Sequence, residues 1–241
     1  VWLNRGISMA NHICSVSRKM YSYGMEMGYV QSNPFSTFKC RTPKSRKTLW
    51  TRDQVKQFLD YSYSNFKTRN LGLIVQMAYE WCQRIGDMRL LKFSCIDFDK
   101  GILHLEQSKR RATVHLPISE DLLTMLVQQK EEYGFQEYVA PMPKAIRGAY
   151  KPYSLHGVSK IGRQAISSAG LPNELRLADL RRTGTTEMVE AGVSMGQIMS
   201  VTGHANPNSV MPYMKNTYIS AKKALTVRES LGISTRQVPN S

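Results

Sequence analysis

The sequence contains few cysteines and no cluster of them that would suit a metal ion. Its four cysteines are Cys14, Cys40, Cys82 and Cys95, and they form no CxxC pair. No cysteine–histidine group has the spacing of a zinc site, which argues against a zinc-binding module. We therefore expect reduced thiols in a cytoplasmic setting, with Cys82 in the core because it lies in an apolar run.

Long apolar runs and acidic residues are also scarce. No apolar run approaches the length of a membrane span, and no signal peptide is recognisable. The chain has 33 lysines plus arginines but only 18 acidic residues, which gives a net charge of +15 over 241 residues. Such a balance attracts polyanions, because each neutralised phosphate releases counterions. The charge favours a nucleic-acid partner, with an ordinary basic protein or a membrane-surface binder as the alternatives.

The N-terminal part combines one helical pattern with a run of cations. Apolar residues follow helical spacing over 7–30, and Asn33-Pro34 ends the pattern. The chain starts at Val1, directly before this pattern, so we expect it to be part of a longer protein. Five cations then fall within nine residues without apolar periodicity: Lys39, Arg41, Lys44, Arg46 and Lys47. Because like charges repel, we predict an extended basic linker over 31–48 that contacts a phosphate backbone, with a solvated loop as the alternative.

The rest of the chain predicts a mixed α/β domain that is mostly helical. Thr51 and Gln54 have capping-box spacing, and residues 71–82 are apolar nearly all round, as in a buried helix. Residues 95–119 alternate apolar and polar side chains with two turn signals, which predicts a small three-stranded antiparallel sheet. Further helices are predicted after Ser119 and near 155–169, 179–191, 195–202 and 219–231.

Several basic and polar side chains stand at the edges of these predicted elements. Arg84 follows the buried helix in "QRIGD", and Arg181 and Arg182 open the helix of "DLRRTGTT". The other side chains of this kind are Lys109 in a predicted β-turn, His204 after the helix-stopping Gly203, and Tyr213 nine residues after His204. For any one of the arginines, a structural salt bridge or a solvated charge is the alternative interpretation. Asp87 would equally suit a salt bridge or a supporting contact.

The order and spacing of this set resemble those of the tyrosine recombinases, also called phage integrases, over nearly the whole chain. The resemblance implies the catalytic-domain fold of that family over 49–241. It also implies a remnant of the helical DNA-binding domain over 1–30, joined by the basic linker 31–48. It further implies a protein of a bacterial host's cytoplasm that acts without metal or nucleotide cofactor. The implied partners are double-stranded DNA and three further protomers, which make a tetramer on the DNA, and no membrane.

The resemblance also implies a role for each residue of the set in site-specific DNA recombination. Arg84 and Arg181 would clamp the scissile phosphate, because the planar guanidinium donates two parallel hydrogen bonds and keeps its charge. Lys109 would protonate the departing 5′-oxygen, and His204 would contact the phosphate. Tyr213 would be the nucleophile that forms a 3′-phosphotyrosyl bond.

One position departs from the family pattern and keeps other interpretations open. The family usually has a histidine, often a lysine, three residues before the second arginine, where this chain has Ala178. Alanine cannot move a proton, so we expect a slow enzyme, or a relative that binds DNA without cutting it. We expect Asp179 to cap the following helix rather than replace the missing base. A helix-turn-helix regulator over 185–201 is a further alternative, although its second helix lacks lysine and arginine.

Overall fold

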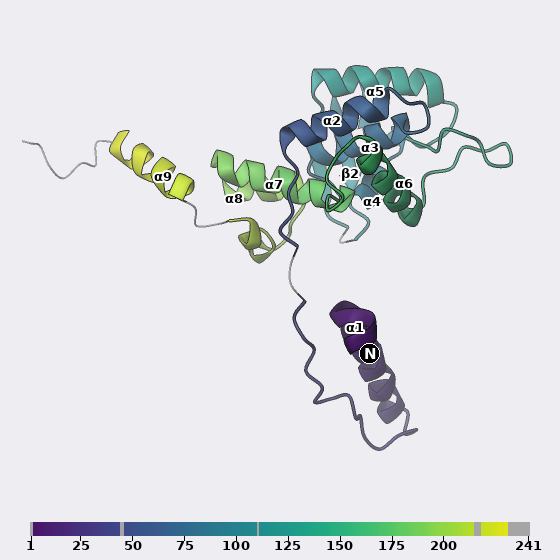
Figure 1. Cartoon of the computed structure of the whole chain (residues 1–241), viewed down its shortest axis with the longest axis vertical. Helices are drawn as coiled ribbons and strands as arrows, with labels where there is room; N and C mark the ends of the chain where they lie inside the picture. Colours follow the sequence, from purple (N-terminus) through teal and green to yellow (C-terminus); the bar gives the residue numbers. More distant parts are fainter. Residues whose placement is uncertain (1, 44–45, 110, 215–217, 231–241) are drawn as a thin grey trace, which may run out of the picture. The chain divides into compact units, whose positions relative to one another are not determined.

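The computed structural model describes residues 2–43, 46–109, 111–214 and 218–230. Contacts between residues divide the chain into two compact units, Val1–Lys47 and Thr48–Ser241 (Figure 1). The first unit contains α1 (Trp2–Glu26). The second contains, in chain order, α2 (Arg52–Tyr63), α3 (Arg69–Glu80), α4 (Ile85–Met88), η1 (Phe93–Cys95), β1 (Ile96–Asp97), β2 (Ile102–Glu106), β3 (Thr113–Pro117), α5 (Glu120–Tyr133), α6 (Leu155–Ser168), η2 (Leu177–Asp179), α7 (Leu180–Ala191), α8 (Met195–Thr202), η3 (Pro207–Ser209), η4 (Met211–Tyr213) and α9 (Tyr218–Ser230). Elements labelled η are short 3₁₀ turns.

Helix α1 ends earlier than the sequence pattern suggests. We expected the helix to reach residue 30, but it stops at Glu26. The reason is Gly28, whose φ of 74° is left-handed and ends the helix, while the Tyr29 N–H turns back to the Gly24 carbonyl. The chain then runs back along the helix, where the Asn11 side-chain amide pairs with both the N–H and the carbonyl of Arg41. Part of the predicted linker is therefore held against α1.

The core of the second unit is built around α3, of which residues 70–75, 77 and 78 are buried, as its largely apolar composition predicts. The predicted capping box at Thr51 and Gln54 begins α2, and α2 packs beside α3. Helix α7 also lies against α3, and its Gly184 permits the approach. A Cβ at this position would stand 2.5 Å from Cys82 Sγ and 3.2 Å from the Tyr79 carbonyl oxygen. A larger residue here would push the two helices apart.

The predicted sheet is present as three antiparallel strands in the order β1-β2-β3. Leu103 pairs with Leu116, and Leu105 pairs with Val114, and all four side chains are buried. The side chains between them face outward, which is the period-two pattern of a sheet with one covered face. The observed architecture confirms the mixed, mostly helical fold class. Within the described residues, no helix has both the length and the apolar character needed to cross a membrane.

Helices α7 and α8 end as their glycines predict. Gly192 and Gly203 are both left-handed, with φ of 86° and 67°, and each follows directly on its helix. Asp179 is the residue before α7, as expected, but its side chain makes no capping hydrogen bond. The reason is that η2 leads straight into α7, so that Asp179 already has helical backbone angles.

Candidate active site

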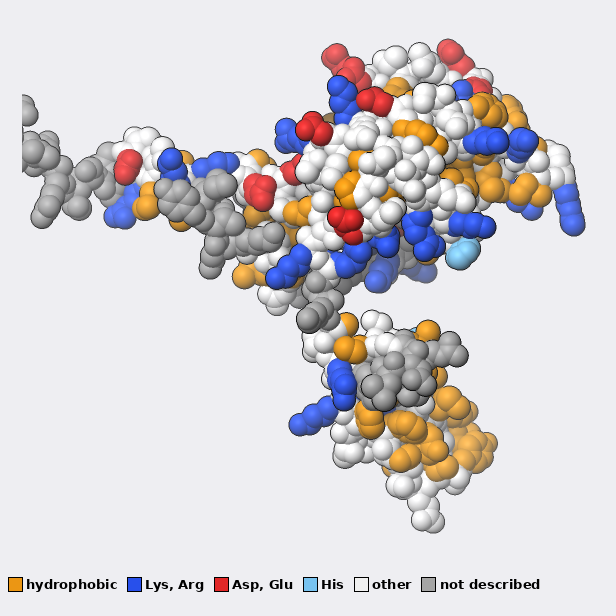
Figure 2. Space-filling model, viewed as in Figure 1, with side chains coloured by type: hydrophobic (Ala, Val, Ile, Leu, Met, Phe, Trp, Pro, Cys, Tyr) orange, Lys and Arg blue, Asp and Glu red, His pale blue; other side chains and the backbone are white. Residues whose placement is uncertain are grey.

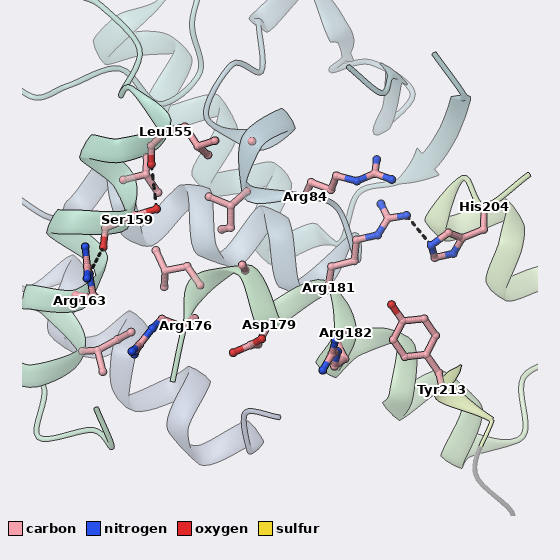
Figure 3. A pocket seen from close by; sticks show the side chains of 16 residues that line it. Arg84, Leu155, Ser159, Arg163, Arg176, Asp179, Arg181, Arg182, His204 and Tyr213 are labelled. Carbon is pink, nitrogen blue, oxygen red and sulfur yellow. Dashed lines mark hydrogen bonds between the residues drawn. The ribbon is translucent and has the colours of Figure 1, made fainter. Parts of the chain in front are cut away.

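A pocket of about 610 Å³ opens where α4, α6, α7, η2 and η4 meet (Figure 3). Five arginines and one acidic residue supply the charged side chains of its lining: Arg84, Arg163, Arg176, Arg181, Arg182 and Asp179. His204, Tyr213 and Ala178 also line it. The excess of arginine makes the pocket suitable for an anion with several oxygen atoms.

Arg84 reaches the pocket because the chain turns sharply after α3. We expected a helix over 71–82, but α3 stops at Glu80, and Cys82 is left-handed with φ of 51°. A non-glycine residue rarely adopts this conformation, so the surrounding packing must hold it. The turn makes Arg84 the N-cap residue of α4. Its Nη1 donates to Gln107 Oε1 at 2.8 Å and lies 3.6 Å from Asp87 Oδ2.

Asp87 connects Arg84 to the β2–β3 turn. Its Oδ1 accepts hydrogen bonds from both the backbone N–H and the hydroxyl of Ser108, at 3.2 and 2.5 Å. The carboxylate is buried, so these contacts and the ion pair offset its loss of water. Asp87 therefore makes both contacts suggested for it, a salt bridge and a support for its neighbours.

Arg181 is the buried member of the arginine pair. Its Nη2 donates to the Thr202 carbonyl at 2.6 Å and lies 3.3 Å from His204 Nε2. Burial lowers the pKa of Arg181 to about 10, and the positive charge of Arg84 adds to the effect. Arg181 is still protonated at neutral pH, so the pocket holds two neighbouring positive charges. A phosphate would relieve their repulsion.

His204 is oriented by the end of α8. The Thr202 hydroxyl donates to the Ile198 carbonyl at 2.7 Å and lies 2.8 Å from His204 Nδ1. Because that hydroxyl proton is already used, Nδ1 must be the donor, which leaves the Nε2 lone pair facing Arg181. An imidazolium would instead present an Nε2–H to an anion in the pocket.

Tyr213 reaches the pocket on the short turn η4. Its backbone N–H donates to the carbonyl of the buried Val210, which anchors the turn. The Tyr213 ring lies 6.4 Å from the His204 ring, measured between centroids. Figure 3 shows the hydroxyl directed toward the region where Arg84, Arg181 and His204 converge. The stretch 204–213 thus brings its histidine and tyrosine to one pocket.

Other predicted site residues lie elsewhere. Lys109 is exposed in the β2–β3 turn and does not line the pocket. Lys39, Arg41, Arg46 and Lys47 belong to the first unit and are exposed, whereas Lys44 lies outside the described residues. Sequence reasoning missed Arg163 and Arg176. Arg163 lies within the helix predicted near 155–169 and is exposed on α6, whereas Arg176 precedes η2 and belongs to no predicted element.

The phage integrase family model matches residues 49–219. The chain belongs to the phage integrase family. This finding confirms the resemblance noted in the sequence. The tyrosine recombinase XerC of Syntrophus aciditrophicus is 20% identical over 229 residues, covering 92% of this chain and 72% of the relative. The virulence plasmid integrase pGP8-D of Chlamydia muridarum is 26% identical over 147 residues, covering 60% of this chain and 43% of the relative. The chain therefore spans less than half the length of that integrase.

Solved integrase structures share the fold. A lambda integrase dimer bound to a COC′ core site matches with a TM-score of 0.70 and 20% identity, covering 100% of this chain and 65% of that chain. A lambda integrase tetramer bound to a Holliday junction has the same TM-score of 0.70 and the same 20% identity. The match covers 89% of this chain and 62% of that chain. The phage integrase fold of the chain is therefore established, and the pocket lies within the matched region.

Proposed function

We propose that this protein is a site-specific DNA recombinase that cuts and rejoins strands through a covalent bond to Tyr213. The observation that carries the proposal is the convergence of Tyr213, His204, Arg84 and Arg181 on one pocket. Membership in the phage integrase family supports the same function. Double-stranded DNA and a tetramer assembled on it are the proposed partners, because solved relatives include a dimer and a tetramer bound to DNA. The proposed location is the cytoplasm of a bacterial host.

The proposed chemistry is a pair of exchanges at phosphorus. The Tyr213 hydroxyl loses its proton and attacks, and the bond from phosphorus to the 5′-oxygen breaks. The phosphate remains on Tyr213 through a 3′-phosphotyrosyl bond, and the 5′-oxygen leaves as a hydroxyl after taking a proton. A 5′-hydroxyl of the partner duplex then reverses the step. The number of ester bonds is unchanged, so the reaction needs no nucleotide.

Three pocket residues and Lys109 have proposed parts beside Tyr213 in that exchange. Arg84 and Arg181 bind the non-bridging oxygens and stabilise the charge that develops on them. His204, as the imidazolium, donates its Nε2–H to the same phosphate. The exposed side chain of Lys109 protonates the leaving 5′-oxygen once DNA lies over the pocket.

A nicked DNA substrate tests the proposal. The fragment released beyond the nick cannot rejoin, so a covalent adduct accumulates and runs as a slower band on a denaturing gel. We expect such an adduct from the chain incubated with its recombination site. Tight binding without any adduct would favour the relative that only binds DNA. That second candidate is favoured by Ala178, which offers no proton-handling group to the pocket.

Replacing Ala178 with histidine should speed cleavage by about 10-fold or more, the low end of the range for general acid–base groups. Ala178 is exposed and lines the pocket, so a larger side chain has room there. A base beside the tyrosine hydroxyl would help remove its proton as it attacks. The measurement is single-turnover adduct formation. Ala178→Gln, which can form hydrogen bonds but cannot transfer protons, is the control. A slower Ala178→His enzyme would mean that another residue already fills the role.

DNA binding should weaken steeply with salt. Lysine and arginine side chains gather along the lower edge of the second unit in Figure 2, while most acidic ones lie toward its upper edge. If the five linker cations each contact a phosphate, they contribute about −4.5 to the log–log slope, at about −0.9 per contact. Neutralising Lys44, Arg46 and Lys47 together should flatten the slope by up to about 3. Neutralising Lys130 on α5 is the control. An unchanged slope would show that these cations contact no phosphate.

A further inference from the structure

Two fully buried glutamines, Gln83 and Gln107, lie between the arginines of the pocket. A primary amide is costly to bury unless its polar atoms are paired. Gln107 Nε2 donates to Gln83 Oε1 at 2.7 Å and to the Thr202 carbonyl at 2.8 Å. Gln83 Nε2 donates to the carbonyls of Trp81 and Val201 at 2.8 and 2.7 Å. All four amide protons are therefore used within the protein.

The amide oxygens of the same two glutamines face the arginines. Gln107 Oε1 accepts from Arg84 Nη1 at 2.8 Å, and Gln83 Oε1 accepts a longer bond from Arg181 Nη1 at 3.4 Å. The Thr202 carbonyl, already bonded to Gln107, accepts from Arg181 Nη2 at 2.6 Å. A guanidinium group only donates hydrogen bonds, so flipping either amide would place N–H against N–H. A continuous buried chain of hydrogen bonds thus joins Arg84 to Arg181.

Gln107 links this hydrogen-bond network to the β2–β3 turn and to the end of α8. Its backbone closes the turn that carries Lys109, because its N–H donates to the Ala112 carbonyl and its carbonyl accepts from the Arg111 N–H. Its amide also packs against Gly203, the residue before His204. A Cβ on that glycine would lie 2.7 Å from Gln107 Nε2, which is closer than real contacts allow. The end of α8 is therefore shaped around the Gln107 side chain.

We propose that Gln107, together with Gln83, is a positioning residue that holds the guanidinium groups of Arg84 and Arg181 at the separation one phosphate needs. This inference rests on the proposed function, because it concerns the same pocket. Two neighbouring cations repel each other before DNA arrives, and the amide oxygens offset that repulsion. A displacement of about 1 Å in such a clamp can cost about 10²-fold in rate.

A matched control distinguishes positioning from simple core stability. Gln129 is also a buried glutamine of this unit, and its Nε2 donates to Asn70 Oδ1 at 3.1 Å and to the Val139 carbonyl at 2.8 Å. It does not line the pocket. Gln129→Met and Gln107→Met each remove a buried amide of the same size and two donated hydrogen bonds. Both variants should therefore lose thermal stability.

The first measurement is adduct formation at saturating nicked DNA in a single turnover. We expect Gln107→Met to bind DNA with nearly wild-type affinity but to form adduct about 10²-fold more slowly. Gln129→Met should form adduct at the wild-type rate despite its lower thermal midpoint. Equal, measurable rates of adduct formation in the two variants would overturn the proposal.

The second measurement does not depend on catalysis and uses inorganic phosphate as the probe. At constant ionic strength, phosphate should raise the thermal midpoint of the wild-type chain by about 3–6 °C at a concentration tenfold above its dissociation constant. Gln129→Met should keep this rise and Gln107→Met should lose most of it. If no variant forms adduct but the phosphate response still differs in this way, the recombinase proposal fails and the positioning role stands. A full phosphate response in Gln107→Met, or none in the wild type, would overturn the positioning role.

Discussion

Replacing Tyr213 with phenylalanine is expected to abolish the covalent protein–DNA adduct and to leave DNA binding intact. The substitution removes one oxygen atom from a half-exposed ring on η4, so the pocket and the fold should persist. Without that hydroxyl no phosphotyrosyl bond can form, whatever the other residues contribute. The measurement pairs a denaturing gel on nicked DNA with a binding assay on the intact site.

Tyr218 provides the matched control, because it is a second tyrosine only five residues further on. It begins α9, after the turn that holds Tyr213 beside the pocket. Tyr218→Phe should keep the adduct at the wild-type rate. If Tyr218→Phe loses the adduct and Tyr213→Phe keeps it, the nucleophile has been assigned to the wrong residue of this stretch.

Much of the fold could be predicted from local sequence signals. The capping box at Thr51, the alternating residues of β2 and β3 and the stop at Gly192 each depend on neighbouring residues in the chain. The ends of α1 and α3 were both expected later in the chain than they lie. Gly28 ends α1 before the asparagine–proline signal, and Cys82 adopts a left-handed conformation under the packing of α7. A local glycine set the first boundary, and tertiary packing set the second.

The residues of the candidate site also fall into two groups: those recognisable from short motifs and those that depend on distant contacts. The motifs around Arg84, Arg181, His204 and Tyr213 could be recognised because short stretches carry them, and the structure brings all four to one pocket. Their catalytic roles stay predictions. Arg176 and Gln107 had no local signal, and the motif that contains Gln83 gave that residue no role. Residues far apart in the chain give all three their surroundings. Gln83 and Thr202, for example, meet Gln107 from 24 and 95 residues away.

The pocket also explains why losing one proton carrier need not abolish activity. Ala178 itself supplies no titratable group to the pocket, yet the two guanidinium groups and His204 line it and remain available to the proposed phosphate. Electrostatic stabilisation of the developing charge is usually a larger contribution than proton transfer. A slow enzyme is therefore the expected outcome, and the arginine pair should matter more than position 178.

Replacing Arg181 with lysine should reduce adduct formation by about 10²–10³-fold, the usual cost of losing one donor to a developing oxyanion. Lysine keeps the charge but not the planar fork, so one ammonium nitrogen would have to replace two guanidinium nitrogens that are held apart in a fixed plane. Single-turnover cleavage on nicked DNA measures the loss. Thermal unfolding and DNA binding, measured on the same sample, exclude a folding defect, which matters because Arg181 is buried.

The neighbouring arginine supplies the comparison for this experiment. Arg182 also lines the pocket, but its side chain leaves α7 about 100° away from that of Arg181. Among the described residues, the structure gives Arg182 no hydrogen-bond partner, whereas Arg181 reaches Gln83, Thr202 and His204. Because the guanidinium of Arg182 makes no such bonds, an ammonium group replaces it more easily. The Arg182→Lys variant should therefore cleave DNA far faster than the Arg181→Lys variant. Equal losses in the two variants would mean that the phosphate is shared by both arginines and that Arg181 has no special place in the clamp.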